Sequence, residues 1–341
     1  MHRASTLCAL TVALLAAPAL AAQKIDSVEI RNGDRITGEI KSLDRGTLSY
    51  STDDMGTLAI EWDKVVRITS IRYFEVELVS GRRYYGALLP AAGPGQVVVE
   101  VGTFSDTLDL PHIVRINPIG RSFFARLDGY INLGLTLQRA NQLFQVSLAT
   151  EVDYRMRLWL TELQTSTYFQ DQEDAEGTSR NTLSLSVQRS LSRRWLAIGA
   201  GQLEQNQELE LDLRALLVAG AGRFLVQTNR GQVLAGGGLT YANESFTGVD
   251  ATSNLEVLLT LGAEYFRRDS PKTNFESNLS VFPSLTDPGR VRTDLELRVS
   301  HEIYKDFTLG LNLFHKFDSR PPSPDAPKND YGVTFTAGWT F

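Results

Sequence analysis

Apolar and polar residues alternate over long stretches of the chain from residue 124 to its end. The last stretch, VTFTAGWTF from Val333 to Phe341, has its large apolar residues on one side and its threonines and glycine on the other. A period of two is the pattern of β-strands, whose side chains point to opposite faces in turn. It predicts twelve strands, at 124–138, 142–154, 158–171, 180–191, 195–207, 209–228, 231–246, 254–268, 272–284, 290–304, 307–318 and 329–341. Because 142–171 and 195–228 can be divided differently, ten strands are an alternative.

This alternation fits both a soluble barrel with its apolar side chains inside and a membrane barrel with them outside. Strand length favours the membrane, because a membrane-spanning strand needs about 9 to 11 residues and globular strands centre on about 5 or 6. Short connections, such as SRR, NRG and KD, alternate with longer ones, such as DQEDAEGTS and SRPPSPDAPKN. Aromatic residues gather near both sets of strand ends, as in interfacial girdles. We therefore predict an all-β protein with an outer-membrane barrel at 124–341, closed by pairing of the last strand with the first near 125–137.

The polar face of such a barrel lines its interior. Most of the charged residues with this parity are acidic, which is usual for the inside of a wet barrel. The candidates for the interior are Asp128, Glu151, Glu256, Glu264, Glu276, Asp294, Glu296 and Arg298.

Residues 26 to 118 contain an internal repeat with an offset of 48 residues. VEIRNGDRITGEI from Val28 returns as VELVSGRRYYGAL from Val76, and each copy begins with a hairpin pattern around a glycine turn. About five short strands fit each copy, which predicts two tandem small β-barrels at 26–71 and 72–119. Their hairpins resemble those of Sm-like and SH3-like barrels. Such modules bind partners more often than they catalyse, and a rigid spacer is the alternative.

The first 22 residues have the pattern of a signal peptide: Arg3, an apolar run and the small residues Ala19-Leu20-Ala21. We expect cleavage near Ala21/Ala22, with an N-terminal anchor helix as the alternative. Cys8 is the one cysteine, so the mature chain would have no disulfide and no cysteine-bound metal. The net charge of −6 argues against nucleic-acid binding. With an even number of strands, both barrel ends lie on the short-turn side, which puts the repeats in the periplasm.

The closing segment YGVTFTAGWTF is similar to the last strand of bacterial outer-membrane proteins, which ends in phenylalanine and is recognised by the barrel-assembly machinery. The resemblance implies that Tyr331, Phe335, Trp339 and Phe341 form the assembly signal. Residues 124–341 also resemble the family of salt-induced outer-membrane proteins of unknown function. The cues are DGYINLGLTL, FQVSLATEVDYR and YKDFTLG. This resemblance implies a Gram-negative outer-membrane location and contact with its lipid, and it assigns no activity.

Candidate chemistry in the mature chain is sparse. His301 and His315 have the lipid-facing parity on neighbouring strands, with Ser277 on the strand before, which leaves a membrane lipid hydrolase as a distant alternative. The sequence contains no nucleotide-binding, zinc or calcium motif. We expect no cofactor, no metal and no catalysis. The expected function is an envelope adaptor that binds a periplasmic protein through 26–119, or a narrow, porin-like channel.

Overall fold

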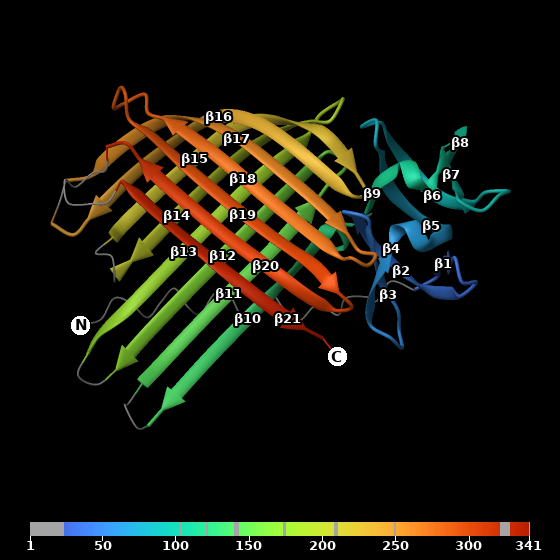
Figure 1. The fold of residues 1–341 in the computed structure, drawn as a ribbon, viewed down its shortest axis with the longest axis horizontal. Coiled ribbons are helices and arrows are strands. Elements are labelled where there is room, and N and C mark those ends of the chain that lie inside the picture. Colours follow the sequence, from blue (N-terminus) through green and yellow to red (C-terminus); the bar gives the residue numbers. More distant parts are fainter. Residues whose placement is uncertain are drawn as a thin grey trace.

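The computed structural model describes residues 24–102, 104–120, 122–139, 143–172, 175–207, 211–248, 250–320 and 328–340. Figure 1 shows a small β-domain beside a large sheet of long, tilted strands. The all-β prediction is confirmed. Among the described residues, no helix has the length and apolar character needed to cross a membrane. The predicted signal peptide and Phe341 lie outside the described residues.

The large sheet contains twelve antiparallel strands in chain order, so the prediction of twelve is confirmed. Most of their ends agree with the sequence pattern to within about three residues. The exception is β13, which begins at Ala175 and not at residue 180, because residues 175–179 continue the strand and Ala175 pairs with Gln172. The strands are β10 (Leu127–Gln138), β11 (Leu143–Arg155), β12 (Trp159–Gln172), β13 (Ala175–Ser190), β14 (Trp195–Asn206), β15 (Leu211–Thr228), β16 (Gly231–Phe246), β17 (Thr252–Arg267), β18 (Thr273–Pro283), β19 (Val291–Tyr304), β20 (Phe307–Asp318) and β21 (Asn329–Trp339).

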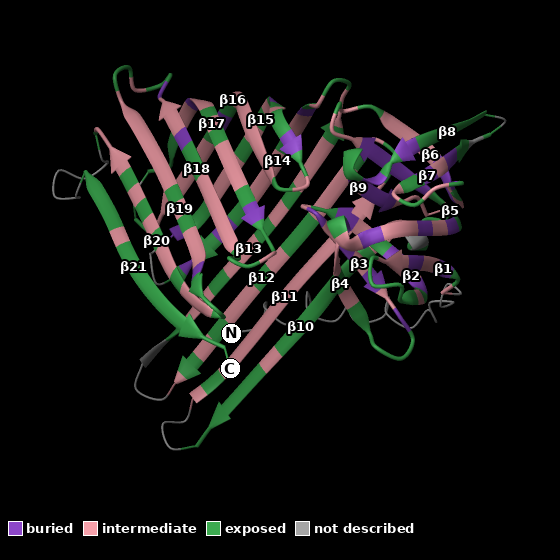
Figure 2. Cartoon of the chain, turned by 45° about the vertical axis from the view of Figure 1, so that its right-hand side comes forward, coloured by how far each residue is buried: buried purple, intermediate pink, exposed green. Residues whose placement is uncertain are grey.

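The two faces of this sheet differ in polarity and in burial. On the apolar face, Leu133 is 74% exposed and Phe335 is 79% exposed. On the polar face, Glu256 is 3% exposed and Glu204 is 7% exposed. The sheet is a single layer that curls around its polar face, so its apolar face points outward (Figures 1 and 2). This is the reverse of a soluble barrel, and it is the design of a barrel surrounded by lipid.

The two ends of the twelve-stranded sheet are free edges. Among the described residues, β10 pairs only with β11 and β21 pairs only with β20, so the ladder expected between the last strand and the first is not formed in this structure. Both edges are open to solvent, where water can satisfy their N–H and C=O groups. Hydrocarbon cannot do so, and a bilayer would therefore favour closure of this seam.

The N-terminal domain has nine strands that follow the internal repeat. They are β1 (Asp26–Ile30), β2 (Arg35–Asp44), β3 (Thr47–Ser51), β4 (Thr57–Glu61), β5 (Val65–Leu78), β6 (Arg83–Pro90), β7 (Gln96–Val101), β8 (Phe104–Asp109) and β9 (Ile113–Pro118). The first half of β5 pairs with β1, and its second half pairs with β9. Each copy thus supplies five strands, and the expected boundary at 71/72 falls inside the strand that they share.

One buried core joins the two copies. Val28 and its repeat equivalent Val76 are both fully buried in it. Trp62, in the short 3-10 turn η2 (Trp62–Lys64), donates its indole N–H to the carbonyl of Leu110, its equivalent in η3 (Leu110–His112), at 2.8 Å. The equivalent glycines Gly38 and Gly86 both sit where a neighbouring strand passes within contact distance of a Cβ. The repeat therefore builds one domain with a shared core and approximate internal symmetry.

Candidate functional site at the covered end of the barrel

The N-terminal domain lies against the end of the sheet that carries its short turns (Figure 1). The contact begins at the tip of the β2–β3 hairpin, where Arg45 and Gly46 both have left-handed backbone conformations, with φ of 50° and 67°. A Cβ on Gly46 would lie 2.4 Å from the carbonyl oxygen of Asn229 in the β15–β16 turn. The glycine is thus required both by the turn and by the close approach of the two parts.

Arg45 extends from this hairpin into the mouth of the barrel. Its Nε lies 2.9 Å from an Oε of Glu264, and its Nη2 lies 3.1 Å from an Oε of Glu276. Its guanidinium also lies 5.4 Å from the ring centre of Phe266, which is only 6% exposed. Glu264 and Glu276 are directly opposite each other on β17 and β18. Two carboxylates facing each other repel, and Arg45, which comes from the N-terminal domain, offsets part of this repulsion.

Three further contacts hold the two parts together. Lys64 Nζ lies 2.8 Å from Oδ1 of Asp269 in the β17–β18 turn. Arg268 donates to the carbonyl of Arg45 at 3.0 Å, and the side-chain amide of Asn229 donates to the carbonyl of Ile113 at 2.8 Å. The hydrogen bond from Lys64 lowers the pKa of Asp269, and the same hydrogen bond raises the pKa of Lys64. Both shifts show that this pair favours its charged form at neutral pH.

Two cavities lie next to the residues that Arg45 and Gly46 contact. One of about 510 Å³ lies between the parts, with Trp62 and Phe266 among its apolar walls and Arg31 and Arg230 among its charged ones. The other, of about 320 Å³, is lined mainly by the polar face of the sheet. Its walls include four of the predicted interior residues, which are Glu264, Glu276, Glu296 and Arg298.

The remaining predicted interior residues share the same face but not the same cavity. Glu256 forms an ion pair of 2.5 Å with Arg292, which reaches across from β19 to β17. Asp294 lies opposite Lys316 in the ladder of β19 and β20. Asp128 and Glu151 lie at the β10 edge of the sheet. The structure therefore places all eight on the polar face by register and brings four of them together.

The β10 edge of the interior is strongly acidic. Asp128 is directly opposite Asp153 on β11, and Asp153 is directly opposite Glu162 on β12. Glu151 lies two residues along the same face. Arg155 lies two residues after Asp153 on β11 and adds a positive charge to this part of the face. Such a row of like charges is costly unless cations are present, so this wall attracts positive ions.

Arg45 is the important residue that the sequence pattern does not single out, and the pattern indicates Phe266 only as one of the aromatic residues near the strand ends. Phe266 has the interior parity on β17, and an aromatic residue at the end of a polar face is a usable signal for a covered end. Arg45 gave no such signal, because LDRGT reads as an ordinary exposed turn. Its role depends on a contact of its hairpin with strands more than 200 residues away, which no local pattern encodes.

The two histidines do not form a shared site. His301 accepts or donates a hydrogen bond with Thr273 Oγ1 at 2.9 Å, and His315 contacts Asn329 Oδ1 at 3.3 Å. In the β19–β20 ladder they lie opposite Leu309 and Leu295, six residues apart along each strand and thus separated by about 20 Å. Ser277 lies opposite Leu297, away from both histidines. This arrangement does not supply the geometry of a hydrolase triad.

One cluster of acids carries the composition of a metal site. Carboxylate oxygens of Glu61, Asp63 and Asp269 lie within 4.8 Å of one another. Lys64 already supplies the positive charge there, at 2.8 Å from Asp269 and 3.8 Å from Glu61. The cluster is therefore explained by the contact between the two parts.

An outward apolar face, a charged inner face and one end covered by a separate domain fit the class of outer-membrane-type β-barrels with twelve strands. The chain belongs to the family described as "Protein of unknown function, DUF481", whose model matches residues 131–341, which is more than half of the chain and nearly all of the large sheet. No curated protein sequence matches the chain. A solved structure described as "Bacterial polysaccharide outer membrane secretin" is similar at 11% identity with a TM-score of 0.38, over 79% of this chain and 96% of that one.

Proposed function

We propose that this protein is a narrow outer-membrane conduit whose periplasmic end is kept shut by its own N-terminal domain. The observation that carries the proposal is the insertion of Arg45 into the barrel mouth, where it pairs with Glu264 and Glu276. A domain that served only as an adaptor would have no need to place a charge on two interior carboxylates. The contact has the form of a plug.

The interior suggests what such a conduit would pass. Its acidic wall at Asp128, Asp153 and Glu162 favours cations, and the pairs between Arg292 and Glu256 and between Arg214 and Glu244 narrow the space. A barrel of about twelve strands is small enough to be largely filled by its own side chains. We therefore propose selectivity for small cations over anions and larger solutes.

The outward apolar face supports the membrane location. We propose that the signal peptide directs export, that the barrel-assembly machinery inserts the barrel through its last strand, and that the short-turn end faces the periplasm. Fractionation tests this location: the mature protein is expected in outer-membrane fractions, and recovery as a soluble periplasmic species contradicts it. We propose no catalytic role, since His301, His315 and Ser277 lie apart.

Single-channel recording tests the function. The refolded full-length protein is expected to show rare, brief, cation-selective openings in planar bilayers, because the docked domain closes one end. A variant with Glu264 and Glu276 replaced by glutamine keeps the size of these side chains but lacks their charge, and it is expected to open more often. A complete absence of current from both proteins would overturn the conduit and leave the adaptor function, in which 26–119 binds a periplasmic partner.

A further inference from the structure

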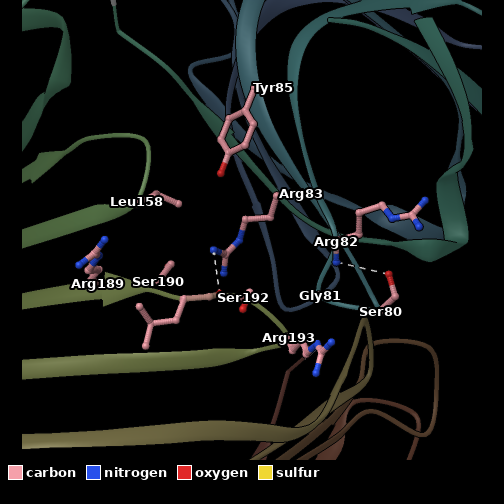
Figure 3. A pocket seen from close by; sticks show the side chains of 11 residues that line it. Ser80, Gly81, Arg82, Arg83, Tyr85, Leu158, Arg189, Ser190, Ser192 and Arg193 are labelled. Carbon is pink, nitrogen blue, oxygen red and sulfur yellow. Dashed lines mark hydrogen bonds between the residues drawn. The ribbon is translucent and has the colours of Figure 1, made fainter. Parts of the chain in front are cut away.

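A separate cavity of about 730 Å³ lies on another side of the contact between the two parts, and Figure 3 shows it. Arg83 and Tyr85 enter it from β6 of the N-terminal domain. Leu158, Arg189 and Arg193 enter it from the β11–β12 turn and from β13 and its turn to β14. Arg83 also donates to the carbonyl of Leu191, at 3.4 Å, across the boundary. No carboxylate belongs to the described residues that line this cavity.

The positive charge of the cavity is only partly neutralised. Arg83 forms ion pairs with Glu75 at 3.2 Å and Glu77 at 3.1 Å behind the cavity wall. Within the described part of the chain, Arg189 and Arg193 have no carboxylate at ion-pair distance. These two guanidinium groups, together with the hydroxyls of Ser190 and Ser192, therefore offer donors to an anion.

The turn that carries Arg193 has an unusual backbone. Arg193 and Arg194 both have left-handed conformations, with φ of 56° and 66°. Tight hairpin turns with two such residues strongly favour Asn-Gly, because other residues are strained there. The chain nevertheless has arginine at both positions. Retained strain of this kind is typical of a residue with a function beyond the turn.

The cavity opens onto the outward face of the barrel. Arg189 lies directly opposite Trp159 on neighbouring strands, with its guanidinium 5.1 Å from the indole centre. Both have the outward parity, and so does the exposed Leu185 farther along β13. Tryptophan and arginine at a strand end mark the level of lipid headgroups. A molecule held by Arg189 could therefore extend acyl chains along this apolar face.

We propose that this cavity binds the phosphate headgroup of an anionic phospholipid from the leaflet on the short-turn side of the barrel. Planar guanidinium forks and serine hydroxyls suit phosphate, and the apolar face beside them suits acyl chains rather than a free ion. Because Arg83 and Arg193 come from different parts, the bound lipid bridges the N-terminal domain and the barrel. The inference rests on the membrane location proposed above, but not on conduction.

Native mass spectrometry of the full-length protein in neutral detergent tests this site. The protein is offered dioleoyl-phosphatidylglycerol, dioleoyl-phosphatidylcholine or inorganic phosphate. The wild type is expected to retain one phosphatidylglycerol in preference to phosphatidylcholine. Arg189→Gln and Arg193→Gln should each reduce this retention roughly fivefold, as expected for one cation near a charged headgroup.

Arg223→Gln is the matched control, because Arg223 also faces outward and lies 5.9 Å from the ring of a tryptophan, Trp195, but lies outside the cavity. Its retention of phosphatidylglycerol should equal that of the wild type. Equal retention of the two lipids, equal loss in the control, or displacement of the lipid by millimolar inorganic phosphate would each overturn the proposal. The conduit is tested by conductance and the lipid site by lipid retention, so the two proposals fail separately. A wild-type protein that conducts but does not prefer phosphatidylglycerol would overturn the lipid site alone.

Discussion

Removing the charge of Arg45 should release the N-terminal domain from the barrel mouth. Arg45→Gln keeps much of the side-chain length but eliminates the ion pairs with Glu264 and Glu276. The arginine is 36% exposed in its side chain, so each pair is screened and contributes about 0.5 to 1 kcal/mol. Two pairs contribute about 1 to 2 kcal/mol to docking, so their loss should raise the ratio of undocked to docked protein roughly 5- to 30-fold.

Single-channel recording measures this shift as open probability. Arg45→Gln should raise the open probability by the same factor while leaving the conductance of the open state unchanged, because the barrel wall is intact. Lys41→Gln is the matched control: it removes one positive charge from the same hairpin, but Lys41 pairs with Glu39 inside the N-terminal domain. It should behave as the wild type.

A double-mutant cycle distinguishes a direct contact from a general loss of charge. If Arg45 acts through Glu264, the combined variant Arg45→Gln with Glu264→Gln should open little more than Arg45→Gln alone. Additive effects, or an Arg45→Gln variant with unchanged open probability, would refute the plug mechanism.

Three further predictions concern the Lys64–Asp269 contact, the core of the N-terminal domain and the open seam of the large sheet. The hydrogen bond from Lys64 lowers the pKa of Asp269, so this pair contributes fully to docking above the ordinary carboxylate range and loses its contribution as pH falls through the lowered pKa. Acid should therefore raise the open probability of the wild type, and it should raise that of Asp269→Asn by a smaller factor. Gly86→Ala places a Cβ 1.8 Å from the Glu100 carbonyl and should destabilise the full chain by about 1 to 3 kcal/mol in denaturant titration, whereas Gly93→Ala, with its nearest contact at 3.9 Å, should be nearly neutral. Cysteine pairs on β10 and β21 should form disulfides in lipid vesicles, and a complete failure across all registers would contradict closure of the seam.

The strands of the barrel could be predicted from the sequence because the side chains of each strand alternate between two kinds of surroundings. Each residue faces either outward or toward the interior, so the alternation at Leu133 or Phe335 reports one physical choice. The twelve strands and the polar face that carries Glu264 and Glu276 follow from it. The period alone does not give the orientation of the sheet, since it fits both a soluble and a membrane barrel; the strand lengths, the alternating connections and the aromatic residues predict the outward apolar face, and the exposure of Leu133 and Phe335 agrees with them.

The relationship between the parts was not predictable in the same way. The repeat with its offset of 48 residues gave the equivalence of Val28 and Val76, but not the sharing of β5 or the common core. The docking of Arg45 depends on shape and charge across a boundary between distant segments. A local sequence pattern indicates the turn that carries Arg45 but not the carboxylates of Glu264 and Glu276 that it contacts. The site is therefore visible only in the folded structure.

Tethering the domain to the barrel tests the central claim most directly. Lys64→Cys with Asp269→Cys places one thiol on each side of a contact whose native Nζ and Oδ1 atoms lie 2.8 Å apart, and a short bis-methanethiosulfonate linker can join the thiols through two reducible disulfides, with methanesulfinate as the leaving group. Conductance is then recorded in one bilayer before and after reduction. The plug mechanism predicts almost no current while the tether is intact and cation-selective openings once it is reduced. Equal currents in the two states would contradict it.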